Sequence, residues 1–339
     1  MIPTSLPSRQ PPAWQQALQE AVSDPAELLE ILGLGPEWLE PARAAARRFP
    51  LKVPRGFVGR MRRGDPRDPL LLQVLPLGAE LDDVPGYVTD PVGDLASMAG
   101  PGLLHKYEGR ALLVTTGACA IHCRYCFRRH FPYDDENASR AGFRPALDAI
   151  RADTSIAEVI LSGGDPLTLN DRRLTMLWEG LAAIPHVRRV RIHTRLPVVL
   201  PERIDGAFLE SWSAVPLQKV AVVHANHANE IDGAVRAAIA RLRAADTIVL
   251  NQTVLLRGIN DRVADLLALS EALFEAGVLP YYLHLLDRVA GAAHFDTPAA
   301  SAQRLVADLA TQLPGYLVPR LVREESGAPA KTVLPPASR

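Results

Sequence analysis

Short apolar runs alternate with helix-like segments through the middle of the chain, and this alternation constrains the fold more than any other feature. The runs read as near-continuous apolar strands, which is typical of a parallel sheet covered on both faces. Their residue ranges are 111–116, 158–163, 189–194, 219–224, 248–255 and 281–286. Six such units are too few for a closed eight-stranded barrel. We therefore predict an α/β fold with an open, partial (β/α)6 barrel, whose active groups lie at the carboxyl ends of the strands.

The segments on either side of this region have a different character. Asp24 and Pro25 can begin a helix through residue 32, and residues 36–49 predict a second one. Residues 50–95 are rich in Pro, Gly and Asp and are expected to be loops. A helix is predicted at 297–313, followed by a mostly extended tail. The expected organisation is a mainly helical N-terminal extension (1–95), the barrel (96–296) and a C-terminal segment (297–339).

Composition excludes several classes of protein. The 339 residues carry a formal net charge of −1, which gives no field favouring nucleic acid or an anionic membrane. No apolar run approaches the roughly 18 residues that a spanning helix needs. The N-terminus lacks the charged-then-apolar pattern of a secretory signal. A cytoplasmic enzyme is the resulting expectation, with no nucleic-acid or membrane partner.

The only three cysteines, Cys119, Cys123 and Cys126, directly follow the first predicted strand. Three thiolates from one short loop suit a four-iron cluster in which each cysteine binds a separate iron. The fourth iron is then open to a small molecule. The alternative is a zinc site completed by His122 or His130, but a closed zinc site prefers two separated pairs of ligands, and no second pair exists.

Polar residues also stand at the ends of later predicted strands. The second strand ends in Ser162, Gly163, Gly164 and Asp165, where the glycines let backbone approach a ligand closely. In isolation this motif is a turn, and single polar residues at strand ends are often helix caps. The remaining candidates for contact with a cofactor are His193, Arg195, His224, Asn226, Gln252 and Arg257.

The cysteine spacing C-x3-C-x2-C, with Tyr125 before the last cysteine, resembles the radical SAM superfamily. The resemblance implies a [4Fe–4S] cluster that cleaves S-adenosylmethionine, with Asp165 accepting the ammonium of that molecule. The residues expected to bind S-adenosylmethionine are Tyr125, Ser162, Gly163, Gly164, Asp165, His193, Arg195, His224 and Gln252.

Residues 100–331 resemble one family within that superfamily, lysine 2,3-aminomutase. The matching stretches are HKYEGRALLVTTGACAIHCRYCFRR, LSGGDPLTL, RLPVVLPERI, NQTVLLRGINDR and YYLHLLDRVAGAAHFDTP. The resemblance implies an isomerase that also uses pyridoxal phosphate and moves an amino group of L-lysine to give β-lysine. It requires a lysine for the cofactor, and the chain has only four lysines.

The resemblance assigns roles to individual residues of this chain. Lys331 matches the lysine that binds pyridoxal phosphate, and Lys106, Tyr107 and Arg110 match contacts to that cofactor. The family has arginine at the position of Lys106, so bidentate geometry is lost there. Arg128 matches the arginine for the substrate carboxylate. Asp287 matches a carboxylate for the distal ammonium of lysine, and Glu324 stands where the family has a second aspartate.

Two further expectations rest on resemblance. The short chain resembles the subgroup that makes β-lysine for modifying translation elongation factor P. An electron donor such as flavodoxin or ferredoxin is implied, and the chain is a possible homo-oligomer. The alternatives are an aminomutase acting on another amino acid such as glutamate, a radical SAM maturase without pyridoxal phosphate, and a non-catalytic metal-binding module.

Overall fold

The computed structural model describes residues 11–139 and 142–338, and its centre is one mixed sheet of ten strands. The strands are adjacent in chain order, from β1 to β10. All six predicted strands are present, each within two residues of its expected bounds. They are β3 (Arg110–Thr116), β4 (Glu158–Gly163), β5 (Arg189–Thr194), β6 (Gln218–His224), β7 (Thr247–Val254) and β8 (Leu279–His284). These six pair in parallel, as the apolar runs predicted.

Four strands were not predicted, and they lie at the two ends of the sheet. β9 (Arg320–Arg323) adds a seventh parallel strand beside β8. The others, which pair antiparallel, are β1 (Met98–Gly100), β2 (Leu103–Tyr107) and β10 (Thr332–Val333). β1 and β10 lie at opposite ends of the strand order, so the sheet is open within the described residues.

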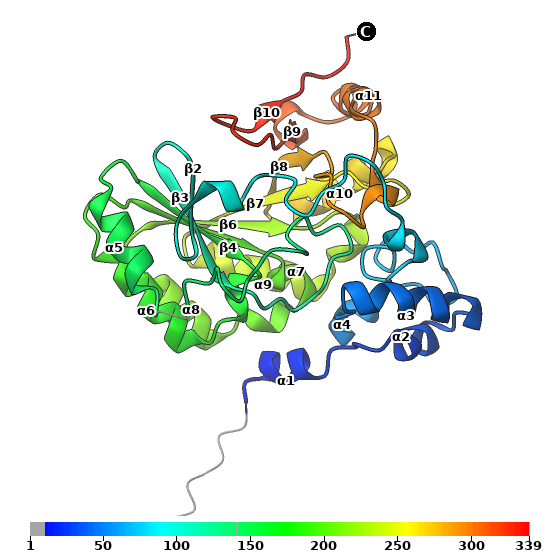
Figure 1. Cartoon of the computed structure of the whole chain (residues 1–339), viewed down its shortest axis with the longest axis horizontal. Helices are drawn as coiled ribbons and strands as arrows, with labels where there is room; N and C mark the ends of the chain where they lie inside the picture. Colours follow the sequence, from blue (N-terminus) through cyan, green and yellow to red (C-terminus); the bar gives the residue numbers. More distant parts are fainter. Residues whose placement is uncertain (1–10, 140–141, 339) are drawn as a thin grey trace, which may run out of the picture.

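Helices between the strands cover one face of this sheet. They are α5 (Arg144–Ala152), α6 (Asp171–Ala182), α8 (Gly206–Ser213), α9 (Gly233–Ala244) and α10 (Val263–Glu275). Asn170, Asp205 and Asp232 cap α6, α8 and α9 by accepting hydrogen bonds from backbone N–H groups in the first turn. Figure 1 shows α5, α6, α8 and α9 together on one side of the sheet.

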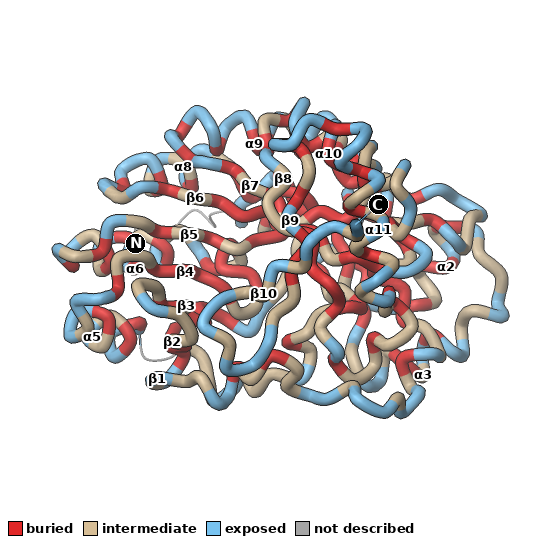
Figure 2. Tube along the Cα trace, turned by 90° about the horizontal axis from the view of Figure 1, so that it is seen from above, coloured by how far each residue is buried: buried red, intermediate tan, exposed pale blue. Residues whose placement is uncertain are grey.

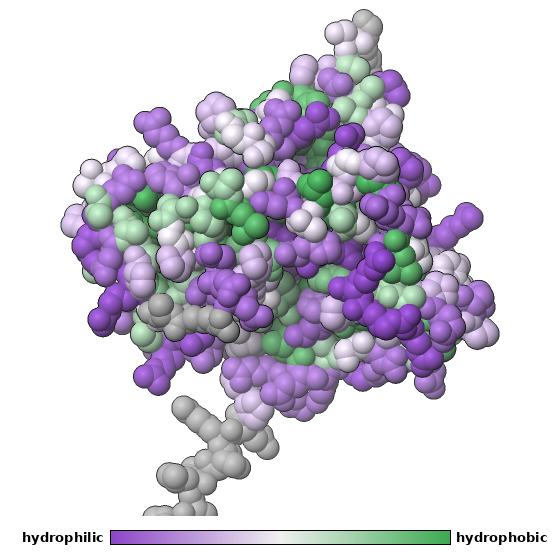
Figure 3. Space-filling view, in the orientation of Figure 1, coloured by the Kyte–Doolittle hydropathy of each residue, from purple (hydrophilic) through white to green (hydrophobic). Residues whose placement is uncertain are grey.

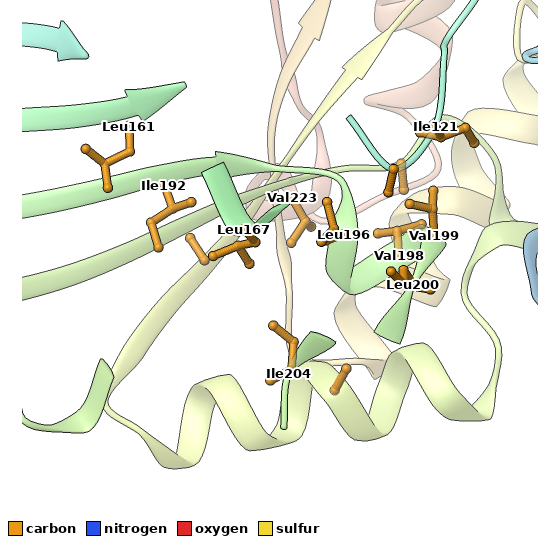
Figure 4. Close-up of a cluster of buried hydrophobic side chains, with 14 of the residues drawn as sticks. Ile121, Leu161, Leu167, Ile192, Leu196, Val198, Val199, Leu200, Ile204 and Val223 are labelled. Atoms are coloured by element: carbon orange, nitrogen blue, oxygen red, sulfur yellow. The ribbon is translucent and has the colours of Figure 1, made fainter. Parts of the chain in front are cut away.

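The core lies between the sheet and these helices. Leu161, Ile192 and Val223 come from β4, β5 and β6, and Figure 4 shows them beside Leu167 and Ile204 from the connecting segments. All five side chains are buried. Because side chains alternate along a strand, Leu161, Ile192 and Val223 face this core, and the residues next to them in each strand face the opposite side of the sheet.

The N-terminal part is helical where it has regular structure. It contains α1 (Ala13–Gln19), α2 (Pro25–Leu32), α3 (Leu39–Arg48) and α4 (Arg55–Val58). Asp24 caps α2 as expected, and Gly33 ends the helix at φ 65°. The buried side chains of Trp14, Val22 and Leu28 belong to the same hydrophobic core as the strands. These helices therefore pack onto the sheet structure rather than around a core of their own.

The C-terminal part returns to the sheet. α11 (Ala299–Leu309) packs against α10, and the tail then forms β9 and β10. This hairpin carries Glu324 and Lys331 back to the end of β8 (Figure 1). The remaining short elements are α7 (Leu196–Val199) and the 3-10 helices η1 (Pro36–Trp38), η2 (Gly78–Leu81), η3 (Leu95–Ser97), η4 (Pro166–Thr168), η5 (Pro201–Arg203), η6 (Ala228–Glu230), η7 (Ala293–Phe295) and η8 (Gly315–Leu317).

Burial follows this layout. Figure 2 shows long buried stretches along the strands and exposed residues on the outer sides of the helices. On the face seen in Figure 3, hydrophobic side chains form small separate groups among hydrophilic ones. Among the described residues, no helix combines the length and the apolar character needed to cross a membrane.

Candidate active site

The sheet face opposite the helices collects most of the polar residues that the sequence singled out. His224 pairs with Gln252, and Gln252 pairs with Tyr282. His284 is two residues beyond Tyr282 and therefore points to the same face. His193 lies opposite Val222, two residues before His224, and joins the same face. Adjacent parallel strands thus bring these side chains together at their carboxyl ends.

The cysteine loop leaves the end of β3 and is held from the N-terminal side. The backbone N–H of His122 donates to Lys52 O at 2.9 Å, and that of Arg124 donates to Gln73 O at 2.9 Å. The buried Arg124 side chain donates to both carboxylate oxygens of Glu80, at 2.8 and 2.6 Å. The residues before the sheet therefore fix the position of all three cysteines.

The donor set of this loop fits an iron–sulfur cluster. Cys119, Cys123 and Cys126 are free and half-buried. Burial, followed by the neighbouring Cys123 thiolate, raises the pKa of Cys126 to about 11. Burial likewise raises the pKa of Cys119, with Cys126 as the next cause. A cationic cluster supplies the positive charge that three adjacent thiolates lack.

The zinc alternative does not match the geometry. Among the described residues, no three His, Cys, Asp or Glu side chains converge where one metal ion could sit. His122 Nδ1 lies 2.9 Å from Pro50 O, and its ring stacks on Phe49. His130 Nε2 lies 3.2 Å from Ala290 O. Thiols that bind separate irons need not converge on one point, so this arrangement favours the cluster.

The glycine pair at the end of β4 lies close to the backbone of a neighbouring segment. A Cβ on Gly164 would lie 2.4 Å from Ala118 O, and a Cβ on Gly163 would lie 2.9 Å from Thr116 O. Gly163 also has φ 112°, which favours glycine. The backbone that these glycines approach is the segment entering the cysteine loop. They set the position of Cys119 relative to the sheet.

Asp165, which is expected to accept the ammonium of S-adenosylmethionine, has protein donors on both carboxylate oxygens. One oxygen of its buried carboxylate accepts from Thr194 Oγ1 at 2.7 Å and Leu167 N at 3.1 Å. The other accepts from Arg195 N at 2.7 Å and Leu196 N at 3.2 Å. A carboxylate has about four acceptor sites, and all are used within the protein. Asp165 therefore ties the end of β4 to the end of β5.

A continuous chain of charged contacts runs along the candidate site. Arg128 Nε donates to Asp94 Oδ2 at 2.7 Å, and Lys106 Nζ donates to Asp94 Oδ1 at 2.6 Å. Lys106 Nζ lies 3.8 Å from Glu324 Oε1, and Glu324 forms an ion pair with Lys331. Four residues predicted from distant parts of the sequence are thereby connected. Arg128 also donates to Ser162 Oγ at 3.0 Å.

Three other predicted residues surround this chain. Tyr107 OH donates to Glu324 Oε1 at 2.5 Å, and the Arg110 guanidinium lies 4.6 Å from the Tyr107 ring centroid. The Asp287 carbonyl accepts from Val289 N at 2.7 Å, but its carboxyl group has no hydrogen bond or ion pair among the described residues. Burial raises the pKa of Asp287 to about 7, Lys331 opposes the shift, and Glu324 adds to it. A carboxyl with a raised pKa therefore faces Lys331 and Glu324.

The same face presents buried nitrogens without partners. They are Nε2 of His193, His224 and His284 and Nε of Arg191. Burial lowers the pKa of His224 to about 3 and that of the other two histidines well below the ordinary value, so all three imidazoles are neutral. Unpaired buried polar groups are costly, and they indicate that ligands complete this site.

The remaining predicted residues lie near the cysteine loop, with one exception. Arg195 Nη1 lies 2.7 Å from Cys123 Sγ, and the Tyr125 hydroxyl accepts from Asn226 Nδ2 at 2.6 Å. Arg257 is exposed, and its backbone N–H donates to Phe295 O at 2.9 Å. Arg257 thus lies away from the group that the strand ends form.

Sequence reasoning missed Asp94, Gln73, Glu230 and His284. Asp94 lies in a loop-rich stretch with no periodic signal. Gln73 and His284 did carry a signal, because each is a single polar residue in an apolar run, LLLQVL and YYLHLL. Glu230 reads as an ordinary residue of a helix start, although its side chain is fully buried.

The chain is similar to known proteins over most of its length. Residues 113–269 match the family model described as the Radical SAM superfamily. The chain is 48% identical to L-lysine 2,3-aminomutase of Escherichia coli (strain K12), over 98% of this chain and 97% of that protein. It is 45% identical to the Haemophilus influenzae protein of the same name, over 98% of each. The L-lysine 2,3-aminomutase of Clostridium subterminale is 32% identical over 95% of this chain and 78% of its own length.

Proposed function

Because the chain belongs to the L-lysine 2,3-aminomutase family of radical SAM enzymes, we propose that it converts free L-lysine into β-lysine with the help of pyridoxal phosphate. Family membership makes the protein an isomerase, and it implies a [4Fe–4S] cluster and S-adenosylmethionine. The observation that carries the proposal is the line of contacts Arg128–Asp94–Lys106–Glu324–Lys331.

The cofactors are assigned to residues that already lie together. Cys119, Cys123 and Cys126 hold the cluster, and Lys331 binds pyridoxal phosphate covalently. When bound, the cluster and S-adenosylmethionine supply a carbon radical that takes hydrogen from an unactivated carbon, and pyridoxal phosphate supplies a conjugated ring that delocalises an unpaired electron. The protein positions these groups and excludes water from them.

Arg128 provides the site for the substrate carboxylate. Its Nε is held by Asp94 and one Nη by Ser162, so the guanidinium has a fixed orientation in a buried setting. A planar guanidinium recognises a carboxylate through two parallel hydrogen bonds. This requirement for a free carboxylate favours free L-lysine over a lysine within a protein.

Asp287 and Glu324 provide the site for the distal ammonium of lysine. Both carboxyl groups face Lys331, whose ammonium occupies this region in the free protein. An amino acid with an acidic or neutral side chain would leave two carboxyl groups facing each other without a cation. Lysine is therefore preferred over glutamate.

Cationic groups near Tyr107 provide the site for the cofactor phosphate. Arg110 stacks on Tyr107 and has no carboxylate partner among the described residues, and Lys106 is one contact away. Arg110 is therefore the cation available to a dianionic phosphate, and Lys106, which is paired with Asp94, adds positive charge beside it. We assign S-adenosylmethionine to the remaining strand-end residues, with Asp165 as a positioning residue; they are Tyr125, Ser162, Gly163, Gly164, His193, Arg195, His224 and Gln252.

The wider biological setting is also proposed. The likeness of this short chain to the elongation factor P subgroup supports β-lysine supply for that modification. A flavodoxin or ferredoxin is the proposed electron donor, and a homo-oligomer is the proposed assembly. We interpret the open parallel sheet as a partial (β/α)6 barrel, with divisions of the chain near residues 95 and 296.

The test is an anaerobic incubation of the reconstituted protein with L-lysine, S-adenosylmethionine, pyridoxal phosphate and dithionite, followed by detection of β-lysine. Lys331→Ala is the inactive control. Formation of β-glutamate from glutamate, with no β-lysine from lysine, would assign a different substrate. Full activity without pyridoxal phosphate would remove that cofactor from the mechanism, and a protein that yields no 5′-deoxyadenosine would not be a radical enzyme.

A further inference from the structure

The guanidinium of Arg195 is the charged group in closest contact with the cysteine loop. Nη1 lies 2.7 Å from Cys123 Sγ, and Nη2 donates to Gln73 Oε1 at 2.7 Å and to Glu230 Oε2 at 3.0 Å. The residue is 5% exposed. Because the residue is buried, these three contacts determine where its charge lies.

Glu230 is built into the structure as a fixed, buried carboxylate. Its Oε1 accepts from Asn226 N at 2.7 Å, His227 N at 3.0 Å and Gln73 Nε2 at 3.1 Å. Its Oε2 is left for Arg195. A carboxylate held by three other donors cannot turn away, so it fixes the guanidinium that it pairs with.

Gln73 completes the arrangement from the N-terminal part of the chain. Its Nε2 donates to Pro69 O at 3.1 Å and to Glu230, while its Oε1 accepts from Arg195 and from Asn226 Nδ2 at 2.9 Å. The side chain is fully buried. The side-chain amide of Gln73 thus contacts both Arg195 and Glu230, and its backbone carbonyl accepts from Arg124 N in the cysteine loop.

We propose that Glu230 and Gln73 are positioning residues that hold Arg195 against the sulfur of Cys123, and that this buried charge pair sets the reduction potential of the cluster. The proposal rests on the assignment of the cluster to the three cysteines. Hydrogen bonds to the sulfurs, local charge and solvent exposure are the levers by which a protein tunes such a potential.

Substitution of Arg195 and substitution of Glu230 should shift the reduction potential of the cluster in opposite directions. The reduced cluster carries one more negative charge than the oxidised one, so a cation beside a cysteine sulfur stabilises the reduced form. Removing the charge of Arg195 therefore lowers the potential. Removing the charge of Glu230 raises it; the amide oxygen of Glu230→Gln keeps the three N–H contacts of Oε1, and the contact of Oε2 with Arg195 is lost. Charges are weakly screened in this water-excluded region.

The test is a redox titration of the reconstituted cluster, followed by electron paramagnetic resonance without substrate. Arg195→Gln should reduce the ratio of reduced to oxidised cluster at the wild-type midpoint by about tenfold, which is about 59 mV for a one-electron couple. Glu230→Gln should raise that ratio by only about threefold, because the Glu230 carboxylate contacts Arg195 and not the Cys123 sulfur, so its charge lies farther from the cluster. The double variant should lie between the two.

Glu158→Gln is the matched control, because Glu158 also pairs with an arginine, Arg191, at 2.5 Å. It lies at the start of β4, five residues from the end that faces the cysteine loop, or about 16 Å along the strand. The reduction potential of the cluster in Glu158→Gln should equal that in the wild type.

Shifts of the same sign in both single variants, or unchanged potentials, would overturn the inference. If one single variant does not fold, the other and the double variant decide the sign, because a buried pair is better tolerated when both charges are removed. A wild-type protein that binds no iron would overturn the cluster assignment itself. A cluster that forms with unshifted potentials would overturn only the role of the charge pair.

Discussion

Asp94→Asn is the substitution whose consequence the structure determines most directly. Asp94 is 2% exposed and joins two cations, Arg128 at 2.7 Å and Lys106 at 2.6 Å. Burial alone would raise the pKa of its carboxyl, but Arg128 and Lys106 together hold it below the ordinary value. The carboxylate is therefore charged, and asparagine removes the charge while keeping the shape.

The expected cost follows from what remains. Hydrogen bonds to charged groups are worth about 1.5–3 kcal/mol each, and the amide keeps one acceptor of the two. Breaking a buried pair by removing one partner costs about 3–5 kcal/mol. Lys106 retains a weaker contact with Glu324, 3.8 Å away, which offsets part of the loss. We expect a decrease of about 3 kcal/mol in the free energy of unfolding.

Urea denaturation followed by circular dichroism measures this quantity, and Asp65→Asn is the matched control. Asp65 also accepts from an arginine, Arg62 at 3.1 Å, and from a backbone N–H, Arg67 N at 2.9 Å, but it lies at the surface. An exposed pair contributes about 0–1 kcal/mol. Equal losses in Asp94→Asn and Asp65→Asn would refute the view that burial makes Asp94 the centre of the charged chain.

Three further predictions concern the site. Burial raises the pKa of the Asp287 carboxyl to about 7, Glu324 and Asp94 add to this shift, and Lys331 and Lys106 oppose it. The carboxyl binds an ammonium only when it is ionised, so the affinity for L-lysine should weaken as the pH falls below 7. In calorimetry, the affinity of Asp287→Asn for L-lysine should not change with pH, and a pH dependence equal to that of the wild type would contradict the assignment. Lys331→Ala should lose the visible absorption band of covalently bound pyridoxal phosphate, and a retained band would exclude this lysine. Gly164→Ala should lower the free energy of unfolding by about 1–3 kcal/mol and should also lower the iron content, because its Cβ would meet Ala118 O at 2.4 Å. Gly206→Ala is the control, because its Cβ would meet nothing within 4 Å, and it should change neither quantity. A normal iron content in Gly164→Ala would show that the cysteine loop can shift freely.

The alternating strands and helices were predictable because each strand shows its burial in its own stretch of sequence. A strand covered on both faces must be apolar along its length, so runs such as 158–163 identify themselves, and all six predicted strands are present. β9 and β10 were not predicted, because two to four residues carry no periodic signal. Their formation depends on the neighbouring edge of β8.

The candidate site was predictable where a residue lies in a motif, and unpredictable where it acts through a distant partner. Lys331 and Arg128 stand in stretches that resemble a known family. Asp94 contacts Arg128 and Lys106 only after the chain has folded, and nothing in the loop around it marks that role. Asp165 shows the same dependence on folding: its position at a strand end indicated a ligand contact, but its internal donors Thr194, Arg195 and Leu196 come from the neighbouring strand and the turn after it.

Glu324 shows why a departure from the family pattern can be accommodated. Its carboxylate pairs with Lys331 and accepts from Tyr107, and Lys106 is also within 4 Å. Burial would raise the pKa of Glu324, but Lys331, Tyr107 and Lys106 together hold it below its ordinary value. Under the proposed function, Lys331 would hold pyridoxal phosphate, and the distal ammonium of a lysine substrate would add a cation beside Asp287 and Glu324. The contacts of Glu324 with Tyr107 and Lys106 do not depend on Lys331, so they can hold the longer side chain in the site whether or not the cofactor is bound.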